Sequence, residues 1–340
     1  MTTSMRSDSS SAPLIVVNAN AKRGGRRIAA ELGKRLPSMR VALTRSVDEL
    51  DGLLREQARE TPVFAAGGDG TAIGLVNALD RAWPKPAALP PVGILPLGTG
   101  NAWARVSGVS VLDDAVSRLA GHRGPLPTRA FSVARCEGQL THFCGSGWDA
   151  EVLDAYRRQL EHARGPMKRF AKSVGGYLVA VFRDTVPRSL VNGLPTVRVE
   201  SLDGEVWVPE SNGRIRRLEG ILPGQVIHEG PAAVAGAATC PEFGYRFRAY
   251  PFAERLLNFL HVRVYGANSA LGALSIPRLW VGEEKLPHMN DWLMRRVRFT
   301  FDRPVAFQSA GDAWGLRETS LIEADDRVVD VVDWRQVDRL

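Results

Sequence analysis

The sequence predicts an α/β domain with a parallel sheet and helices on both faces, followed by a β-rich, sandwich-like antiparallel domain. The chain has 340 residues, enough for about two domains. Apolar runs alternate with amphipathic helical stretches in the first third, and short alternating strands replace them from Arg129 onward. We expect domains at 14–127 and 128–320, after a disordered leader at 1–13. The sequence leaves open whether 321–340 is a strand or a helix, and whether it returns to the first domain.

Apolar periodicity gives the elements of the first domain in order. The first strand is a continuous apolar run, Leu14–Val17, that ends at Asn18 and is typical of a strand buried on both faces. An amphipathic helix follows the glycine pair Gly24 and Gly25. The next elements alternate in the same way: a strand at 41–43, a helix at 47–59 and a strand at 62–66. In such a sheet, ligands bind beyond the carboxyl ends of the strands.

The third strand runs directly into a glycine-rich loop, Gly67-Gly68-Asp69-Gly70-Thr71, which opens a helix. Missing Cβ atoms let the main chain approach a ligand, and the free amides and dipole of the first helical turn favour an anion. Thr71 adds a hydroxyl donor, and Asp69 is useful if a divalent metal bridges it to phosphate. The loop predicts a phosphate site; a strand-to-helix turn without a ligand is the alternative.

A second glycine loop follows the apolar strand Val92–Leu95. It reads Pro96-Leu97-Gly98-Thr99-Gly100-Asn101. Adjacent parallel strands place the loops at their carboxyl ends side by side, so we expect the two loops to share one crevice. Taken alone, this second loop is explained equally well as a plain turn. The pair favours a phosphate site.

The region after Arg129 predicts an antiparallel sheet. Two turns, Glu137-Gly138 and Asp203-Gly204, are flanked by short alternating strands and are typical of hairpins. Further strands are expected at 261–265, 297–301 and 305–307.

Composition excludes several classes of protein. No window approaches the ~20 uninterrupted apolar residues that a membrane-spanning helix needs, so we expect a soluble chain. The 44 basic and 37 acidic side chains give a net charge of +7, which favours an anionic partner without identifying it. Three cysteines without CxxC spacing fit a reducing cytosol. The six histidines lack the i, i+4 pairing of a zinc helix, so we expect no metalloenzyme.

These motifs together resemble a known family. The GGDGT loop at 67–71, the PLGTGN loop at 96–101 and an opening strand that ends in Asn18 are similar to the catalytic domain shared by diacylglycerol kinases, sphingosine kinases and bacterial lipid kinases. The stretch CGSGWDAEV at 144–152 is similar to the segment that opens the second domain of the bacterial kinases. The resemblance covers residues 14 to about 335, strongly in the first 105 and at 143–152, and loosely elsewhere.

The resemblance implies transfer of the γ-phosphoryl group of ATP, with Mg²⁺, to a hydroxyl of a lipid such as diacylglycerol or a sphingoid base. It also implies that the nucleotide binds in a cleft between the domains. Carried over position by position, the residues implied to contact the nucleotide are Asn18, Ala19, Asn20, Ala21 and Lys22 after the first strand, Thr44 after the second, Gly67, Gly68, Asp69, Gly70 and Thr71 in the first glycine loop, and Gly98, Thr99, Gly100 and Asn101 in the second.

Phosphoryl transfer to an alcohol also needs a carboxylate that accepts the proton. The stretch 308–312, QSAGD, falls where the family commonly has Asp-Gly-Glu, whose glutamate is taken as the base. Here Ala310 replaces the first acid and Asp312 the second, so we assign Asp69 and Asp312 as catalytic residues. Because aspartate is one methylene shorter, Asp312 must lie closer to the substrate oxygen or act through water. The alternative is that Asp312 only shapes a glycine turn.

The family's Asp-Gly-Leu-type segment, which holds a structural Mg²⁺, has no counterpart at 277–284. We therefore expect no metal held by the protein alone, and Mg²⁺ bound mainly by the phosphates of ATP.

A lipid substrate implies transient association with a membrane surface. A basic stretch at 157–172 precedes the apolar residues 174–182, a combination suited to an anionic membrane, although a solvated helix face beside a core helix explains it too. Pro251-Phe252 and Trp280 are candidates to line an acyl-chain pocket, with core packing as the alternative. We expect a cytoplasmic protein, peripheral to the inner face of the membrane, without a nucleic-acid partner. A homodimer stays open.

Two other functions stay open. NAD kinases also carry GGDGT, so a kinase for a soluble nucleotide is one alternative, although PLGTGN and the Asp-Ala-Glu-Val stretch favour the lipid branch. The other is a catalytically silent module that binds a nucleotide or a lipid, which Ala310 keeps open.

Overall fold

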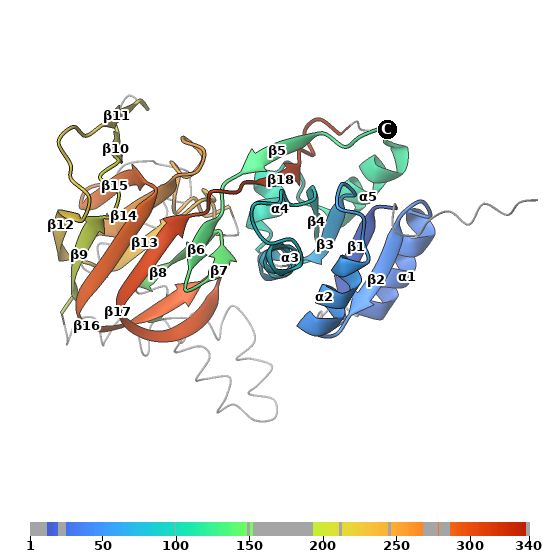
Figure 1. Ribbon diagram of the computed structural model, residues 1–340, viewed down its shortest axis with the longest axis horizontal. Coiled ribbons are helices and arrows are strands. Elements are labelled where there is room, and N and C mark those ends of the chain that lie inside the picture. Colours follow the sequence, from blue (N-terminus) through green and yellow to red (C-terminus); the bar gives the residue numbers. More distant parts are fainter. Residues whose placement is uncertain are drawn as a thin grey trace, which may run out of the picture. The chain divides into compact units, whose positions relative to one another are not determined.

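A computed structural model shows two compact units, each described here by itself (Figure 1). The first contains Met1–Phe131 and Arg327–Leu340, and the second contains Ser132–Asp326. The residues that the structure describes are 12–19, 25–98, 100–147, 150–151, 193–210, 213–243, 246–267, 278 and 286–337.

The first unit is built on a six-stranded sheet in the order β2-β1-β3-β4-β18-β5. The strands are β1 (Leu14–Asn18), β2 (Arg40–Thr44), β3 (Val63–Gly67), β4 (Val92–Pro96), β5 (Thr128–Phe131) and β18 (Val329–Val332). All neighbours are parallel except β18 and β5. The chain leaves β1 toward β2 on one side and returns to β3 on the other, so the strand order reverses between β1 and β3. Ligand crevices of doubly wound sheets form at such a reversal.

Helices cover both faces of this sheet (Figure 1). They are α1 (Gly25–Arg35), α2 (Val47–Arg55), α3 (Asp69–Ala82), α4 (Ala102–Val106) and α5 (Leu112–Gly121). A bidentate ion pair joins Arg81 of α3 to Asp51 of α2, and Arg35 of α1 donates to Asp113 of α5. The predicted α/β architecture with a parallel sheet is confirmed.

The C-terminal segment returns to this sheet as a strand. β18 lies between β4 and β5, with Val331 opposite Val92. Beyond it, the fully buried Trp334 packs against Phe64 of β3, with ring centroids 6.4 Å apart. The segment thus completes the core of the first unit.

In the residues that the structure describes, the second unit is an antiparallel assembly of twelve strands. Their bounds are β6 (Ala134–Cys136), β7 (Gln139–Thr141), β8 (Phe143–Gly147), β9 (Thr196–Ser201), β10 (Val206–Pro209), β11 (Ile215–Arg217), β12 (Gln225–Pro231), β13 (Val234–Ala238), β14 (Leu260–Tyr265), β15 (Met289–Met294), β16 (Arg296–Ser309) and β17 (Asp312–Ala324). The strands expected at 297–301 and 305–307 form the single strand β16, whose pairing with β17 shifts register between Thr300 and Val305. The antiparallel, strand-rich second domain is confirmed.

One predicted hairpin forms and the other does not. Glu137-Gly138 joins the paired strands β6 and β7. Asp203-Gly204 connects β9 to β10, but the hairpin prediction is wrong, because β9 pairs with β12 and β16 while β10 pairs with β11 and β15. The Asp203 carboxylate accepts the amide of Glu205 at 3.1 Å, so a local Asx-type turn stabilises the corner without pairing its flanking strands.

A buried charge cluster joins β14 to β15. The Asp291 carboxylate accepts Arg263 Nε at 2.6 Å and lies 2.9 Å from His261 Nε2. Burial alone would raise the pKa of Asp291, but the charge of Arg263 and the hydrogen bond to His261 outweigh it and lower that pKa to about 2. Arg263 also donates to the Ala249 carbonyl at 2.6 Å, which fixes the connection between β13 and β14.

Several predicted membrane features lie outside the described residues. These are the basic stretch 157–172, the apolar stretch 174–182 and Trp280. Phe252 is described and is 1% exposed, so it packs in the core rather than lining an open surface. Within the described ranges, the structure has no helix long and apolar enough to cross a membrane.

Candidate nucleotide-phosphate site

The strand ends of the first unit bring the predicted nucleotide residues to one edge of the sheet. Asn18 at the end of β1 lies opposite Thr44 at the end of β2, and Gly67 at the end of β3 lies opposite Pro96 at the end of β4. β1 and β3 are neighbours, so the four ends form one row. The row includes the strand reversal, where a ligand is expected.

The turn after β1 is tied to β2. The Ala19 amide donates to the Thr44 carbonyl at 2.8 Å, and Thr44 is 9% exposed. A Cβ on Gly25 would lie 2.6 Å from the Asn18 carbonyl oxygen, so a glycine is needed where α1 starts against this turn. Asn20, Ala21 and Lys22 lie outside the described residues.

The first glycine loop leads into α3 without a side-chain cap. Gly68 is the N-cap, and its carbonyl accepts the amides of Thr71 and Ala72, each at 3.0 Å. The Thr71 side chain occupies the space where a Cβ on Gly67 would stand. The amides before Thr71 are those that a helix cannot satisfy by itself, and they carry the positive end of the helix dipole. This start of α3 is suited to an anion.

The two glycine loops lie against each other. The Leu97 amide donates to the Gly67 carbonyl at 3.0 Å. A Cβ on Gly68 would lie 3.0 Å from Gly98 Cα, and one on Gly98 would lie 2.9 Å from Asn101 Oδ1 and overlap Gly68 Cα. Both positions therefore require glycine because two backbones meet there. The expectation that neighbouring strands place these loops side by side is confirmed.

Asp69 links the first loop to α4. Its Oδ2 accepts the amide of Ala102 at 3.0 Å and its Oδ1 accepts the amide of Trp103 at 2.9 Å. The carboxylate thus caps a helix that begins 33 residues later and has no acid in its own first turn. These two amides are already bonded, so any main-chain donors that the second loop offers a phosphate must precede Ala102.

The other end of α4 carries the opposite charge. Its last carbonyl, Val106, accepts Arg335 Nη2 at 2.6 Å and Arg129 Nη2 at 2.9 Å. A carboxylate at the amino end and two guanidinium groups at the carboxyl end both complement the helix dipole. This five-residue helix is therefore fixed at both ends, and it fixes the loop before it.

Asn101 shapes the second loop. It is in the left-handed region, with φ of +49°, and its Nδ2 donates to the Gly98 carbonyl at 2.7 Å. Arg105 donates to the Gly100 carbonyl from the first turns of α4. Thr99, to which the resemblance assigned a hydroxyl contact, lies outside the described residues.

Asp312, the predicted base, belongs to the second unit. It is exposed, and it pairs with Ser309 at the end of the β16–β17 hairpin. The turn between them is Ala310-Gly311, with φ of +50° and +86°, the signs of a type I′ turn. The turn is made by Ala310 and Gly311, and Asp312 already stands in the strand.

The glycines of the CGSG stretch have a packing explanation. Gly145 of β8 lies opposite Gly236 of β13, and a Cβ on Gly145 would lie 2.5 Å from Gly236 Cα. A Cβ on Gly236 would lie 2.6 Å from the Tyr250 hydroxyl. Trp148 and Asp149 lie outside the described residues.

Sequence reasoning missed the partners that fix the site. The bonds of Asp69 to α4 and of Arg129 and Arg335 to Val106 join residues far apart in the chain. One signal was available: a short helix after Asn101 without an acid in its own first turn needs a cap from elsewhere.

The diacylglycerol kinase catalytic domain, as a family, matches residues 13–126. This stretch contains both glycine loops and the row of strand ends. Residues 13–126 are therefore similar to that family of catalytic domains.

Curated relatives match over parts of their length. Human diacylglycerol kinase zeta is 45% identical over 62 residues, which are 18% of this chain and 6% of the relative. A probable lipid kinase YegS-like protein of Pseudomonas fluorescens is 35% identical over 149 residues, which are 41% of this chain and 47% of the relative. The matched part is thus less than half of this chain and less than half of each of these two relatives.

Solved structures are similar in fold over most of the chain. A putative diacylglycerol kinase from Bacillus anthracis str. Sterne superposes with a TM-score of 0.60 at 16% identity, covering 96% of this chain and 99% of that one. An NAD kinase from Archaeoglobus fulgidus in complex with ATP gives 0.50 at 13% identity, covering 94% and 93%. At these identities the likeness concerns the fold alone.

Proposed function

We propose that the protein is an ATP-dependent lipid kinase that transfers the γ-phosphoryl group to a lipid hydroxyl. The observation that carries this proposal is the contact between the two glycine loops at Gly68 and Gly98, at the start of α3. Two loops that meet without side chains, beside the positive end of a helix, suit a polyphosphate. The match of residues 13–126 to the diacylglycerol kinase catalytic domain supports a kinase.

In this proposal each part of the site has a separate task. The amides at Gly68–Gly70 bind a phosphate group of ATP, and Asn18 and Thr44 lie along the same edge to contact the rest of the nucleotide. Asp69 positions the second loop by holding α4. Phosphoryl transfer depends mainly on such positioning and on neutralising charge.

In this proposal Mg²⁺ arrives with ATP, and Asp69 is the residue that would contact it. Each Asp69 oxygen already accepts a backbone amide, which leaves its second lone pairs for a metal or a metal-bound water. In the described ranges, His, Cys, Asp and Glu form no group of three or more that could hold a metal. When bound, Mg²⁺ neutralises charge on the phosphates.

For the chemical step we propose Asp312 as the general base. The lipid hydroxyl oxygen forms a bond to the γ-phosphorus as the bond from that phosphorus to the bridging oxygen breaks, and ADP leaves with the bonding electron pair. The hydroxyl proton passes to the Asp312 carboxylate, directly or through water. The exposed position of Asp312, directly after the two-residue turn at Ala310-Gly311, supports this role.

The proposed acceptor is a lipid such as diacylglycerol or a sphingoid base, met by transient association with the cytoplasmic face of a membrane. The names of the relatives support this substrate class, since they include diacylglycerol kinases and a probable lipid kinase. An NAD kinase shares the fold, so NAD is the soluble acceptor to compare.

The test is a transfer assay with radiolabelled ATP and Mg²⁺. The protein is mixed separately with vesicles that contain diacylglycerol, vesicles that contain a sphingoid base, and NAD without vesicles. Label in the organic phase of a vesicle sample, lost when the lipid acceptor is omitted, is the expected result. Label on NAD, or ATP binding without transfer to any lipid, would overturn the proposal.

A further inference from the structure

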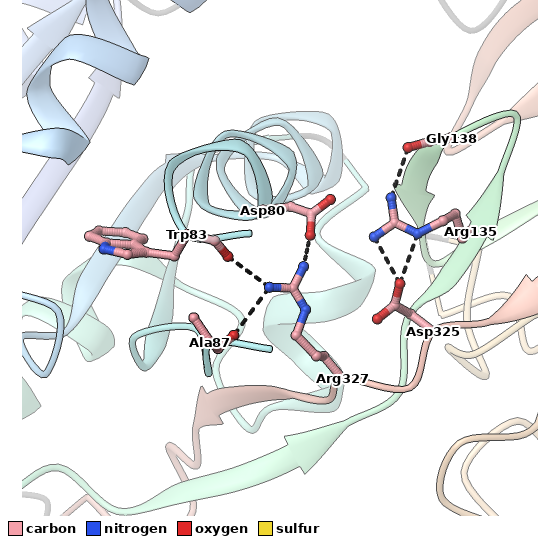
Figure 2. Close-up of polar contacts among 7 residues, drawn as sticks. All are labelled: Asp80, Trp83, Ala87, Arg135, Gly138, Asp325 and Arg327. Carbon is pink, nitrogen blue, oxygen red and sulfur yellow. Dashed lines mark hydrogen bonds and ion pairs between the residues drawn. The ribbon is translucent and has the colours of Figure 1, made fainter. Parts of the chain in front are cut away.

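The C-terminal segment of the first unit begins with an arginine that holds the far end of α3. Arg327 pairs with Asp80 in the last turn of α3 and donates from Nη1 to the carbonyls of Trp83 at 2.8 Å and Ala87 at 3.2 Å. Figure 2 shows the guanidinium pointing at these three acceptors, and its side chain is only 11% exposed. One side chain thus fixes both the end of α3 and the start of the connection to β4.

The same segment contacts the elements that carry the second glycine loop. β18 pairs with β4, the strand before that loop. The Trp334 amide donates to the Ser107 carbonyl at 2.9 Å, and Arg335 donates to Val106 at the end of α4. Residues 327–335 therefore contact α3, β4 and the end of α4, which are the elements that flank the two glycine loops. Arg327 is the first of these residues along the chain.

On the other side of Arg327 the chain enters the second unit. Arg135 holds Asp325 at 2.8 Å and donates to the Gly138 carbonyl at 2.8 Å (Figure 2). The Asp325 side chain is 1% exposed. A single residue, Asp326, stands between the anchored Asp325 and the anchored Arg327.

We infer that Arg327 is a positioning residue for the phosphate loop Gly67–Thr71: by fixing the carboxyl end of α3, it sets the position of the loop at the amino end. The inference rests on the proposed function, because it concerns ATP binding at that loop.

The physical basis is the stiffness of a short helix. Asp69 and Asp80 are separated by about 16 Å along α3, a length over which a hydrogen-bonded helix moves as a rod. The buried face of α3 is apolar, and apolar contacts are not directional. Directional bonds at the two ends therefore add to the packing of this face in setting the axial position of the helix. At the carboxyl end, the Arg327 side chain is 11% exposed, whereas that of Arg81 is 47% exposed.

The experiment compares three variants with the wild type. Arg327→Ala removes the bonds of Arg327 to Asp80, Trp83 and Ala87. Asp80→Asn removes the negative charge of Asp80 while keeping the shape of its side chain. Arg81→Ala is the matched control, since Arg81 also fixes the last turns of α3, but to Asp51 of α2 and from a half-exposed position. The two readouts are calorimetric affinity for ATP with Mg²⁺ and hydrogen exchange of the amides at 67–72 in the absence of nucleotide.

We expect about 10-fold weaker ATP binding and faster exchange at 67–72 for Arg327→Ala, and a change in the same direction for Asp80→Asn. For Arg81→Ala both readouts should stay within about 2-fold of the wild type. Arg327→Lys keeps the positive charge but loses the planar guanidinium group that reaches several acceptors. This variant should bind ATP more tightly than Arg327→Ala and more weakly than the wild type. If Arg327 only stabilised the fold, Arg327→Ala would lower the unfolding temperature without these changes in ATP affinity and in hydrogen exchange at 67–72.

Two failures can be told apart. If the wild type binds ATP and Asp80→Asn leaves both affinity and exchange unchanged, the inference is wrong and the proposed function stands. If the wild type binds no ATP, the proposed function is wrong and the inference falls with it. Should Arg327→Ala not fold, Asp80→Asn decides the matter alone.

Discussion

Asp69 accepts a hydrogen bond from the main-chain amide of Trp103 at 2.9 Å, so the acid of the first glycine loop caps the helix that follows the second. A second bond, from the amide of Ala102, completes the cap. The carboxylate therefore links the first glycine loop to the helix that follows the second. This gives Asp69 a structural task that is separate from any contact with metal or phosphate, and the two can be tested separately.

Replacing Asp69 with Asn should weaken both the fold and the site. The amide keeps one acceptor oxygen but turns an NH₂ group toward an N–H, and it loses the charge that complements the α4 dipole. We expect a loss of about 1–2 kcal/mol in the free energy of unfolding, together with weaker ATP binding and loss of transfer. Urea unfolding and calorimetry measure these effects. Asp113 is an exposed acid in the first turn of α5, and Asp113→Asn is the control. It should change the free energy of unfolding and the affinity for ATP only slightly. Unchanged stability of Asp69→Asn would contradict the capping role.

Asp312→Asn tests the proposed base. Because it removes only the proton acceptor, transfer to lipid should fall by about 10²–10⁴-fold while the affinity for ATP stays near that of the wild type. Steady-state transfer and ATP titration on the same preparation separate the two quantities. Glu318→Gln, at another exposed position of β17, is the control and should keep full turnover. Near-normal turnover of Asp312→Asn would mean that another carboxylate takes the proton.

Ala310→Asn should stabilise the second unit. Ala310 has a φ of +50°, a conformation that is energetically unfavourable for alanine because of its Cβ. Asn followed by Gly is the preferred pair for a type I′ turn. We expect a gain of about 0.5–1 kcal/mol in the free energy of unfolding. Thermal unfolding of this variant and of Ala120→Asn gives the comparison. Ala120 is exposed in the last turn of α5, where Asn should cost stability instead. A loss of stability at position 310 would count against the turn assignment.

The Asp291 cluster should make stability depend on pH in the acid range. Its folded-state pKa of about 2 lies below the ordinary value of 3.8, so its stabilising contribution is complete above that value and is lost as pH falls toward 2. The contribution is on the order of 2 kcal/mol. The difference in unfolding free energy between the wild type and Asp291→Asn should therefore be larger at neutral pH than at pH near 3. Asp326 is an exposed acid, so the difference in unfolding free energy between the wild type and Asp326→Asn should change much less with pH. A difference that is constant over the acid range would rule out the lowered pKa.

The sequence was informative wherever structure follows from local pattern. Continuous apolar runs located β1, β3 and β4 to within a residue or two, and the short strand expected at 41–43 is β2, Arg40–Thr44. The alternation of strands and helices was enough to place both glycine loops at one edge of a sheet. It also predicted that they would be neighbours, because strand order alone determines that relation.

What the sequence could not provide were contacts between distant segments. The Asp203-Gly204 turn has the composition of a hairpin, but pairing is decided by β12, β15 and β16, far away in the chain. Nothing near Asp69 shows that its carboxylate faces α4, and nothing near Arg327 shows that Asp80 is its partner. Local composition records which turn forms, whereas tertiary packing selects the partners.

The central claim is that the two glycine loops form one phosphate site, and the affinity of Gly98→Ala for ATP with Mg²⁺ tests it most directly. The added Cβ at Gly98 would overlap Gly68 Cα and force the loops apart. A Cβ added at Gly74, in the middle of α3, meets nothing within 4 Å, so Gly74→Ala is the control. Calorimetry is done at low temperature, where circular dichroism shows each variant to be folded. The account predicts at least about 10-fold weaker binding for Gly98→Ala and wild-type affinity for Gly74→Ala. Wild-type affinity in a folded Gly98→Ala protein would contradict it.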